Sequence, residues 1–287
     1  MINREMQIIR SVGELADYVA MQKNHHHSIG FVPTMGALHA GHISLVERAV
    51  EENGVAVVSV FVNPTQFNNP VDLATYPRKE EEDFRLLAKA GVSAVFAPSV
   101  EEMYPAGTER DHEYNLGSAA EVMEGKFRPG HFQGVAQVVH RLFELVRPDR
   151  AYFGEKDFQQ IAVIRNMVES EHLPVEIIPC PIKRAEDGLA LSSRNALLTD
   201  EQRLRAPEIH AALKDSVAYA ANHSVRATHD SVVERLDAVP EMRVEYFEIV
   251  DGRTLMPVEE WDEAEMVVGC ITVYNGNVRL IDNIRYK

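Results

Sequence analysis

The amino-acid sequence predicts an α/β protein, with a Rossmann-like parallel-sheet N-terminal domain and a smaller α+β C-terminal domain. Residues 29–33 and 55–62 are almost entirely apolar, as strands buried on both faces of a parallel sheet are. A helical pattern over residues 42–53 separates them, which completes a β-α-β unit. From residue 244 onward the pattern changes to strands joined by an Asn-Gly turn. These three observations give the fold class.

Length and composition limit the class of protein. A chain of 287 residues can form two cores, and we expect one domain over residues 1–182 and another over residues 183–287. The formal net charge of −15 argues against nucleic-acid and anionic-membrane partners. No apolar run has the length of a membrane span, and the charged N-terminus does not resemble a secretion signal. The two cysteines, Cys180 and Cys270, lie in apolar contexts far apart in sequence. We expect two buried thiols in a cytoplasmic protein, with a single disulfide as the alternative.

The N-terminal elements follow from hydrophobic periodicity and from turn residues. Acidic residues and an apolar repeat indicate a helix after the second strand, and a long connection follows the third. A later loop carries three basic groups. Long loops over α/β sheets often act as lids, and a purely decorative surface loop is the alternative. The expected elements are helix 11–23, strand 29–33, helix 42–53, strand 55–62, helix 78–90, strand 93–97, connection 98–115, loop 124–132, helix 135–146, strand 151–153, helix 158–170 and strand 175–179.

The C-terminal elements begin after a small-residue stretch that ends near Asn195. A helical run covers residues 200–221. Strand patterns follow at residues 244–250, 266–268 and 271–281, the last folded at Asn275-Gly276. We expect these strands to form a small sheet.

The turn between the first strand and the following helix carries the strongest site signal. It reads Pro33-Thr34-Met35-Gly36-Ala37-Leu38-His39-Ala40-Gly41-His42. Helix N-terminal N–H groups bind anions, glycine allows close approach to the backbone, and imidazoles donate hydrogen bonds. The pattern therefore indicates a phosphate site. A purely structural turn is the alternative, and a metal site is disfavoured because no Cys or carboxylate with zinc-ligand spacing lies nearby.

Three further polar sets lie at predicted strand ends or at the domain boundary, where ligands of open α/β sheets bind. Asn63 and Gln66 follow the second strand, and Lys156 and Asp157 open a later helix. Ser192-Ser193-Arg194 combines two hydroxyls with a guanidinium, which suits a phosphate. The alternatives are an ordinary Asn-Pro turn at Asn63 and a helix cap at Asp157.

Two common nucleotide-binding signatures are missing. No GxGxxG follows the first strand, and Gly125-Lys126 is followed by Phe127 where a P-loop needs Ser or Thr. A dinucleotide-binding or P-loop enzyme is therefore disfavoured. A histidine pair at a helix start instead favours nucleotidyl transfer.

Four motifs in order resemble one known family. His39-Ala40-Gly41-His42 resembles the HxGH signature of the nucleotidyltransferase superfamily. With the motifs that follow, the chain resembles the pantoate–β-alanine ligases, or pantothenate synthetases, from residue 33 to residue 195. Those motifs are Val62-Asn63-Pro64-Thr65-Gln66-Phe67, Gly154-Glu155-Lys156-Asp157-Phe158-Gln159-Gln160 and Leu191-Ser192-Ser193-Arg194-Asn195. The alternatives are another HxGH-type nucleotidyltransferase and a non-catalytic nucleotide-binding module.

The resemblance implies a ligase that condenses pantoate with β-alanine through pantoyl adenylate, releasing AMP and pyrophosphate, in vitamin B5 and coenzyme A biosynthesis. ATP would be a substrate with Mg²⁺, and no tightly bound organic cofactor is expected. The partners would be these small molecules and a second copy of the chain in a homodimer. Because an acyl adenylate hydrolyses readily, we expect the C-terminal domain to act as a lid.

The resemblance also implies roles for matching residues. His42 would be the main catalytic histidine, assisted by His39, Lys156 and Arg194. The ATP-binding residues would be Met35, Gly36, Ala37, Leu38, His39, Ala40, Gly41, His42, Gly154, Glu155, Lys156, Asp157, Lys183, Leu191, Ser192, Ser193 and Arg194.

A second group of implied residues concerns the acceptor and the metal. Gln66, Gln160 and Asn63 would bind pantoate and β-alanine, because amides orient a substrate by hydrogen bonds without adding charge. Asp83 would be an indirect partner of Mg²⁺, outside its direct ligands.

Overall fold

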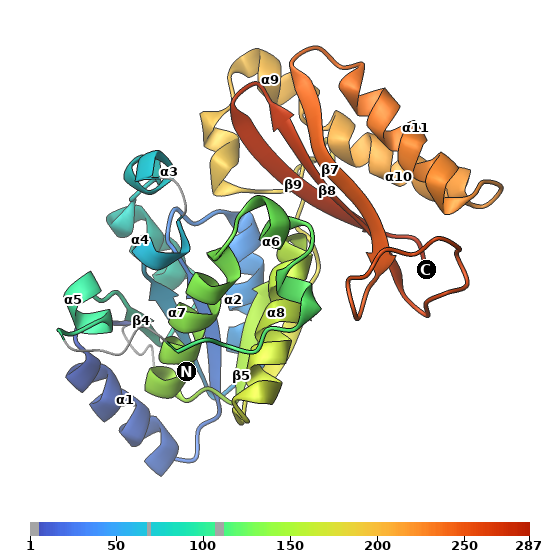
Figure 1. The fold of residues 1–287 in the computed structure, drawn as a ribbon. Coiled ribbons are helices and arrows are strands. Elements are labelled where there is room, and N and C mark those ends of the chain that lie inside the picture. The colour runs from blue at the N-terminus through green and yellow to red at the C-terminus, as the bar shows by residue number, and fades with distance from the viewer. Residues whose placement is uncertain (1–5, 68–69, 107–111) are drawn as a thin grey trace. The chain divides into compact units, whose positions relative to one another are not determined.

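The computed structural model describes residues 6–67, 70–106 and 112–287, with the side chains of residues 70–72 left out. The chain divides into two compact units (Figure 1). The first contains the described residues up to Gly117, with Arg128–Gly154 and Val163–Cys180. The second contains Ser118–Phe127, Glu155–Ala162 and Pro181–Lys287. Two internal segments that we assigned to the N-terminal domain thus cluster with the second unit, and the functional boundary at residues 182/183 stays a prediction.

The first unit contains a parallel sheet of six strands. Their spatial order is β1 (Gln7–Ile9), β4 (Ala94–Phe96), β3 (Val55–Val60), β2 (Ile29–Thr34), β5 (Arg150–Gly154) and β6 (Glu176–Cys180). Strand β2 pairs with β3 on one side and with β5 on the other, in parallel register. The chain changes direction across the sheet at β2, so the carboxyl end of this strand lies at the topological switch point where open α/β sheets bind ligands.

Alternating side chains of β2 bury both faces of this sheet. Val32 packs in one core with Val46 of α2 (Ala40–Glu52) and Leu87 of α4 (Glu80–Lys89). Phe31 points to the opposite face, where its ring lies 6.3 Å from that of Phe143 of α7 (His131–Val146). Two buried faces explain the nearly continuous apolar sequence of these strands. The other helices of the first unit are α1 (Val12–Asn24), α3 (Pro70–Thr75) and α5 (Val100–Met103), and α8 (Phe158–Ser170) spans the division between units.

The second unit contains an antiparallel sheet of three strands in the order β7 (Met242–Asp251), β8 (Val267–Asn275) and β9 (Val278–Arg285). Helices α10 (Glu208–Ala220) and α11 (Val225–Asp237) lie along one face of it (Figure 1) and share an apolar core with that face. This core includes Leu213, Leu236, Phe247, Ile271 and Leu280. Two short helices complete the described unit: α6 (Glu124–Phe127) and α9 (Asp200–Arg205). The predicted fold class, a Rossmann-like sheet domain with a smaller α+β domain, is confirmed.

Several predicted boundaries in the C-terminal part were wrong. The helical run over residues 200–221 is two helices, because Pro207 lacks the N–H that a continuous helix would need. The patterns at 266–268 and before Asn275 are a single strand, β8, since Gly269 lies within the strand rather than ending it. The hairpin at Asn275-Gly276 is confirmed, with Gly276 at φ +59°. Helix α11 and the short strand β1 were not predicted.

The loop predicted over residues 124–132 was also wrong. Residues Glu124–Phe127 form α6, and α7 begins at His131, one turn earlier than expected. Gly130, at φ +80°, starts α7 in a left-handed conformation that suits glycine. Glu124 is buried, so this segment is anchored by a carboxylate rather than presented as a basic loop.

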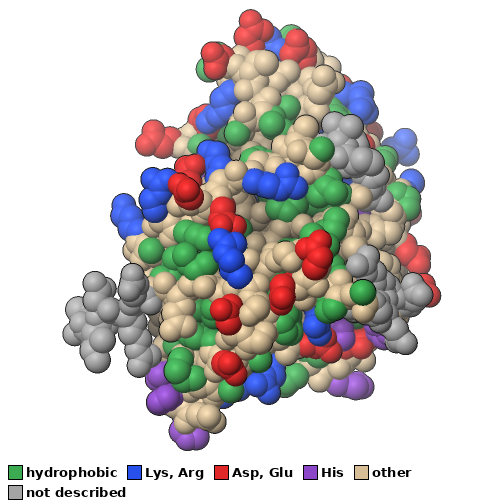
Figure 2. All heavy atoms as spheres, turned by 90° about the vertical axis from the view of Figure 1, so that its left-hand side faces the viewer, with side chains coloured by type: hydrophobic (Ala, Val, Ile, Leu, Met, Phe, Trp, Pro, Cys, Tyr) green, Lys and Arg blue, Asp and Glu red, His purple; other side chains and the backbone are tan. Residues whose placement is uncertain are grey.

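The chain has a formal net charge of −15. On the face shown in Figure 2, acidic and basic side chains are interspersed and the acidic ones do not form one continuous patch. Cys180 and Cys270 are free and buried. Among the described residues, no helix combines the length and apolar character needed to cross a membrane.

Candidate active site

The turn between β2 and α2 is closed by its own two histidines. His39 is the N-cap of α2, and its Nδ1 accepts the backbone N–H of Gly41 at 3.1 Å. In return, Nδ1 of His42 accepts the backbone N–H of His39 at 3.3 Å. The ring centroids lie 4.0 Å apart. This is a capping box in which imidazoles replace the usual hydroxyl and carboxylate.

These two bonds determine which ring nitrogen of each histidine carries the proton. A nitrogen that accepts a hydrogen bond from an N–H has no proton of its own, so in the neutral rings the proton lies on Nε2. His39 and His42 therefore each offer an Nε2–H donor at the N-terminus of a helix, which carries a partial positive charge. Such a site attracts phosphate oxygens.

Asp83, on α4, holds the same turn through its carboxylate. This group accepts the N–H of Ala37 at 2.9 Å through Oδ2 and the N–H of Leu38 at 2.7 Å through Oδ1. Burial raises the pKa of Asp83, although both backbone hydrogen bonds act in the opposite direction. Gly36 and Ala37 adopt φ values of +83° and +50°, and a Cβ at Gly36 would lie 3.0 Å from Asp83 Oδ2. The role that Asp83 shows here is to fix a strained turn, and its role toward Mg²⁺ stays a prediction.

Asn63 organises the loop after β3. It is fully buried, and its Nδ2 donates to Thr65 Oγ1 at 2.9 Å and to the carbonyl of Gly134 at 3.2 Å. Its Oδ1 accepts from the hydroxyl of Tyr104 at 3.1 Å. These bonds position Gln66, whose Nε2 lies 3.1 Å from Met35 Sδ. Gln66 is half-buried beside the histidine turn, whereas the amide of Asn63 is buried and makes hydrogen bonds within the protein.

The start of α7 supports this loop and was missed in the sequence. His131 is buried, its Nδ1 donates to the carbonyl of Gln66 at 2.9 Å, and its Nε2 accepts from Arg128 at 3.2 Å. At Gly134, a Cβ would lie 2.5 Å from the carbonyl oxygen of Thr65, so only glycine fits. The signal that could have been used was Gly130 directly before His131, because glycine is among the residues accepted at a helix N-cap.

The second unit carries the Lys156 motif. Gly154 ends β5 in the first unit, and Glu155–Asp157 form a single 3-10 turn before α8. The Nζ of Lys156 lies 3.3 Å from Asp157 Oδ2, with the lysine half-buried. Helix α8 begins after Asp157, and Gln160 lies half-buried in its first turn.

The last motif follows a closed loop in the same unit. The N–H of Leu191 donates to the carbonyl of Lys183 at 3.0 Å, and Gly188, at φ +94°, makes the turn between them. Ser192 then caps a 3-10 helix over Ser193–Leu197 by accepting the N–H of Arg194 at 3.3 Å. Hydroxyl and guanidinium are thus presented from one short helical turn.

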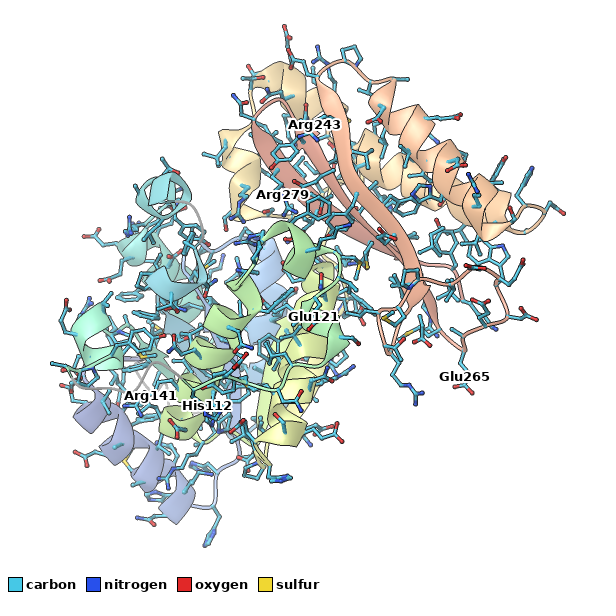
Figure 3. All side chains as sticks on the ribbon, in the orientation of Figure 1. His112, Glu121, Arg141, Arg243, Glu265 and Arg279 are labelled. Atoms are coloured by element: carbon cyan, nitrogen blue, oxygen red, sulfur yellow. The ribbon has the colours of Figure 1, made fainter. Side chains whose placement is uncertain are left out.

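A buried ionic network, also missed in the sequence, anchors α6 to the sheet of the second unit. Arg279 of β9, labelled in Figure 3, donates to both oxygens of Glu124, at 2.9 and 2.7 Å, and also contacts Glu245. Tyr246 and Thr272 donate to Glu124 Oε1 at 2.9 and 3.1 Å. Burial by itself would lower the pKa of Arg279, but hydrogen bonds and ionic contacts with the two glutamates raise it. No periodic sequence signal marks such a long-range pair.

The structure therefore assembles the predicted residues in two groups. Within the first unit, the histidine turn and Gln66 lie together at the carboxyl ends of β2 and β3. Within the second unit, the Lys156 turn and the segment from Lys183 to Arg194 are both tied to β9. The ligand-binding roles of these residues stay predictions.

Comparisons with known proteins identify what the whole chain is similar to. A family model described as pantoate-beta-alanine ligase matches residues 7–285. A pantothenate synthetase of Porphyromonas gingivalis is 57% identical over 282 residues, covering 98% of this chain and 100% of that protein. One from Bacteroides fragilis is 55% identical over 282 residues, covering 98% of this chain and 99% of the relative.

Solved structures give the same result. A pantothenate synthetase from Thermus thermophilus has a TM-score of 0.92 and 46% identity, covering 98% of this chain and 99% of that one. A pantoate-beta-alanine ligase from Francisella tularensis, complexed with beta-gamma ATP and beta-alanine, has a TM-score of 0.80 and 35% identity, covering 98% of each chain. These relatives do not favour the alternative of a different HxGH-type nucleotidyltransferase.

Proposed function

Because the chain belongs to the pantoate-beta-alanine ligase family, we propose that it condenses pantoate with β-alanine to form pantothenate, using ATP. The observation that carries the proposal within the structure is the pair of imidazoles closing the N-terminus of α2. This pair offers two directed donors and a helix N-terminus to one phosphate group. The reaction is a C–N ligation in two steps.

In the first step a carboxylate oxygen of pantoate attacks the α-phosphorus of ATP. The bond from that phosphorus to the bridging oxygen breaks, and pyrophosphate leaves. Negative charge builds on the α-phosphate oxygens, and Nε2–H groups of His39 and His42 stabilise it without reorganising, because backbone N–H groups already hold their rings. His42 has the main catalytic role.

In the second step the amine of β-alanine attacks the acyl carbon of pantoyl adenylate. The acyl carbon–oxygen bond breaks, AMP leaves, and the nitrogen loses a proton as the amide forms. Gln66 and Gln160 orient pantoate by hydrogen bonds, and Gln66 also lies close to the incoming amine. Asn63 contributes to substrate binding by holding the loop that carries Gln66, since its own amide already donates to Thr65 and Gly134.

Residues of the second unit contact ATP in this proposal. They comprise Lys156 and Arg194 as cations on the phosphates, with Glu155, Asp157, Lys183, Leu191, Ser192 and Ser193. Gly154 and residues 35–42 contribute from the first unit. The C-terminal domain acts as a lid that protects the adenylate from hydrolysis.

Mg²⁺ accompanies ATP in the proposal. Within residues 6–67, 70–106 and 112–287, no group of three or more His, Cys, Asp or Glu side chains could hold a metal ion. Mg²⁺ bound to a nucleotide keeps several waters and needs few protein ligands. When bound, the ion neutralises phosphate charge, and Asp83 supports it indirectly through the turn. We further propose a homodimer in the cytoplasm.

The experiment that tests the function is pantoate-dependent exchange of labelled pyrophosphate into ATP, with Mg²⁺ and without β-alanine. We expect exchange that requires pantoate, and AMP formation when β-alanine is added. His42→Ala should abolish most of the exchange, whereas His25→Ala, on an exposed loop, should not change it. ATP binding without any exchange would instead favour a non-catalytic nucleotide-binding module.

A further inference from the structure

The two faces of the C-terminal sheet differ in chemistry. One face is apolar and packs against α10 and α11. The other carries polar side chains that are nonetheless buried, among them Thr272 at 0% and Asn283 at 8% exposure. A buried polar group is stable only with hydrogen-bond partners, so each must be accounted for.

Asn283 finds its partners in the motif that contains Lys156. Its Nδ2 donates to the carbonyl oxygen of Glu155 at 2.8 Å and to that of Lys156 at 3.1 Å. The two N–H groups of this amide therefore donate hydrogen bonds to two consecutive peptide groups. Residues 155–157 make only one 3-10 turn, which has too few internal bonds to fix its own orientation.

We infer that Asn283 is a positioning residue for Lys156 in the proposed adenylation reaction. It holds the peptide planes on both sides of the Lys156 Cα, which sets the direction in which the ammonium group leaves the backbone. Asn283 touches no substrate in this role. The inference rests on the function proposed above, because it assigns the purpose of the contact to the cationic role of Lys156.

The preceding residue ties a second predicted nucleotide segment to the same strand. Asp282 is buried and accepts from Arg184 in a bidentate pair at 2.6 and 2.8 Å. Arg184 belongs to the closed loop between Lys183 and Leu191, which leads into Ser192. Adjacent side chains of β9 point to opposite faces, so two neighbouring residues hold two different segments. The alignment of Lys156 is thus fixed relative to the second phosphate-binding motif.

A matched control lies in the same unit. Asn275 is also a buried asparagine, and its Nδ2 donates to the carbonyl of Gln202 at 2.8 Å. That carbonyl belongs to α9, outside the motifs that resemble ATP-binding segments. Loss of either amide removes a buried donor, but only Asn283 contacts the Lys156 turn.

The experiment compares Asn283→Ala, Asn283→Leu and Asn275→Ala in the pyrophosphate-exchange assay, below the unfolding temperature of every variant. Asn283→Leu keeps nearly the same size and branching but has no donor and adds no charge, so it separates hydrogen bonding from packing. We expect kcat to fall about 10- to 100-fold in both Asn283 variants, as small misplacements of a reacting group do. The KM for pantoate should change little, and Asn275→Ala should keep the kcat of the unaltered chain.

Four outcomes are distinguishable. A selective fall in kcat in both Asn283 variants supports the inference, and Asn283→Leu decides it if the alanine variant does not fold. Equal losses in Asn283→Ala and Asn275→Ala, or a normal kcat in Asn283→Leu, would overturn it. Lack of exchange by the unaltered chain would refute the proposed function instead, and with it the premise of the inference.

Discussion

The two turns that carry the predicted catalytic residues are held in different ways. In the first unit, the turn before α2 is closed by His39 and His42, which are three residues apart. The ring of His39 accepts the N–H of Gly41, and the ring of His42 accepts the N–H of His39. In the second unit, Glu155–Asp157 are held by Asn283, which lies 128 positions from Glu155 in the sequence. The first turn is a local structure, and the second is imposed by a distant strand.

A buried carboxylate supports each of the two units, and the two carboxylates also differ in the groups that they bind. Asp83 is buried, and its carboxylate accepts two backbone N–H groups of the histidine turn. Glu124 is buried with the guanidinium of Arg279 and two hydroxyls. One carboxylate fixes a site, and the other fixes a segment of the fold. Substitutions in the histidine turn should therefore affect activity most, and substitution of Arg279 should affect stability most.

The largest expected effect is on stability in the second region. Arg279→Ala leaves the buried Glu124 and the half-buried Glu245 without their shared cation. We expect a loss of about 3–5 kcal/mol in the free energy of unfolding, because an unpaired buried charge is strongly unfavourable. Urea unfolding measures it. Arg226→Ala, in an exposed pair with Asp230, is the control and should cost less than about 1 kcal/mol. Similar losses in the two variants would contradict the comparison.

The next effect is on activity in the first region. His42→Ala should lower the rate of pyrophosphate exchange by about 10²–10³, as loss of one preorganised donor does. The cap contributes only about 1 kcal/mol to stability, so the protein should remain folded. His39→Asn separates the two functions, since asparagine caps a helix but has no Nε2–H at that reach. Stability like the unaltered chain with reduced exchange is expected, and unchanged exchange would assign His39 to capping alone.

Asp83→Asn should have a smaller effect and also tests the proposed link to Mg²⁺. The amide can accept only one of the two N–H groups of Ala37 and Leu38, so one buried donor is lost at about 1–3 kcal/mol. Exchange should need more Mg²⁺ if Asp83 supports the ion through this turn. If Asp83→Asn is less stable in urea but its activity depends on Mg²⁺ concentration as in the unaltered chain, Asp83 holds the turn and has no role toward Mg²⁺.

The smallest effect is a pH dependence from the second region. Burial, followed by the positive charge of Arg184, lowers the pKa of His210 below its ordinary value of 6.5. Between that value and the folded pKa, the unfolded chain binds more protons than the folded one, so stability falls as pH falls. The free energy of unfolding should drop more in the unaltered chain than in His210→Gln between about pH 7.5 and about pH 5.5. Identical drops would show that His210 does not contribute.

What the sequence determined follows from short-range physics. Apolar runs and helical periodicity predicted most elements of the parallel sheet, and the histidine turn was recognised because its residues lie close together in the chain. The break at Pro207 was readable too, since proline cannot continue a helix, but the strong pattern on both sides of it prevailed in the prediction. The motifs that resemble the family were likewise continuous segments.

Only the tertiary structure decided which distant residues support those segments. Arg279 and Asn283 carry no local signal, because a polar residue on an amphipathic element looks the same whether it faces water or a buried partner. Their partners lie up to 155 positions away, as between Arg279 and Glu124. Local propensity acts over a few residues, whereas burying a polar group requires a partner brought there by the whole fold. The sequence alone therefore determined the fold class and the motifs, and the folded chain decided how the motifs are held.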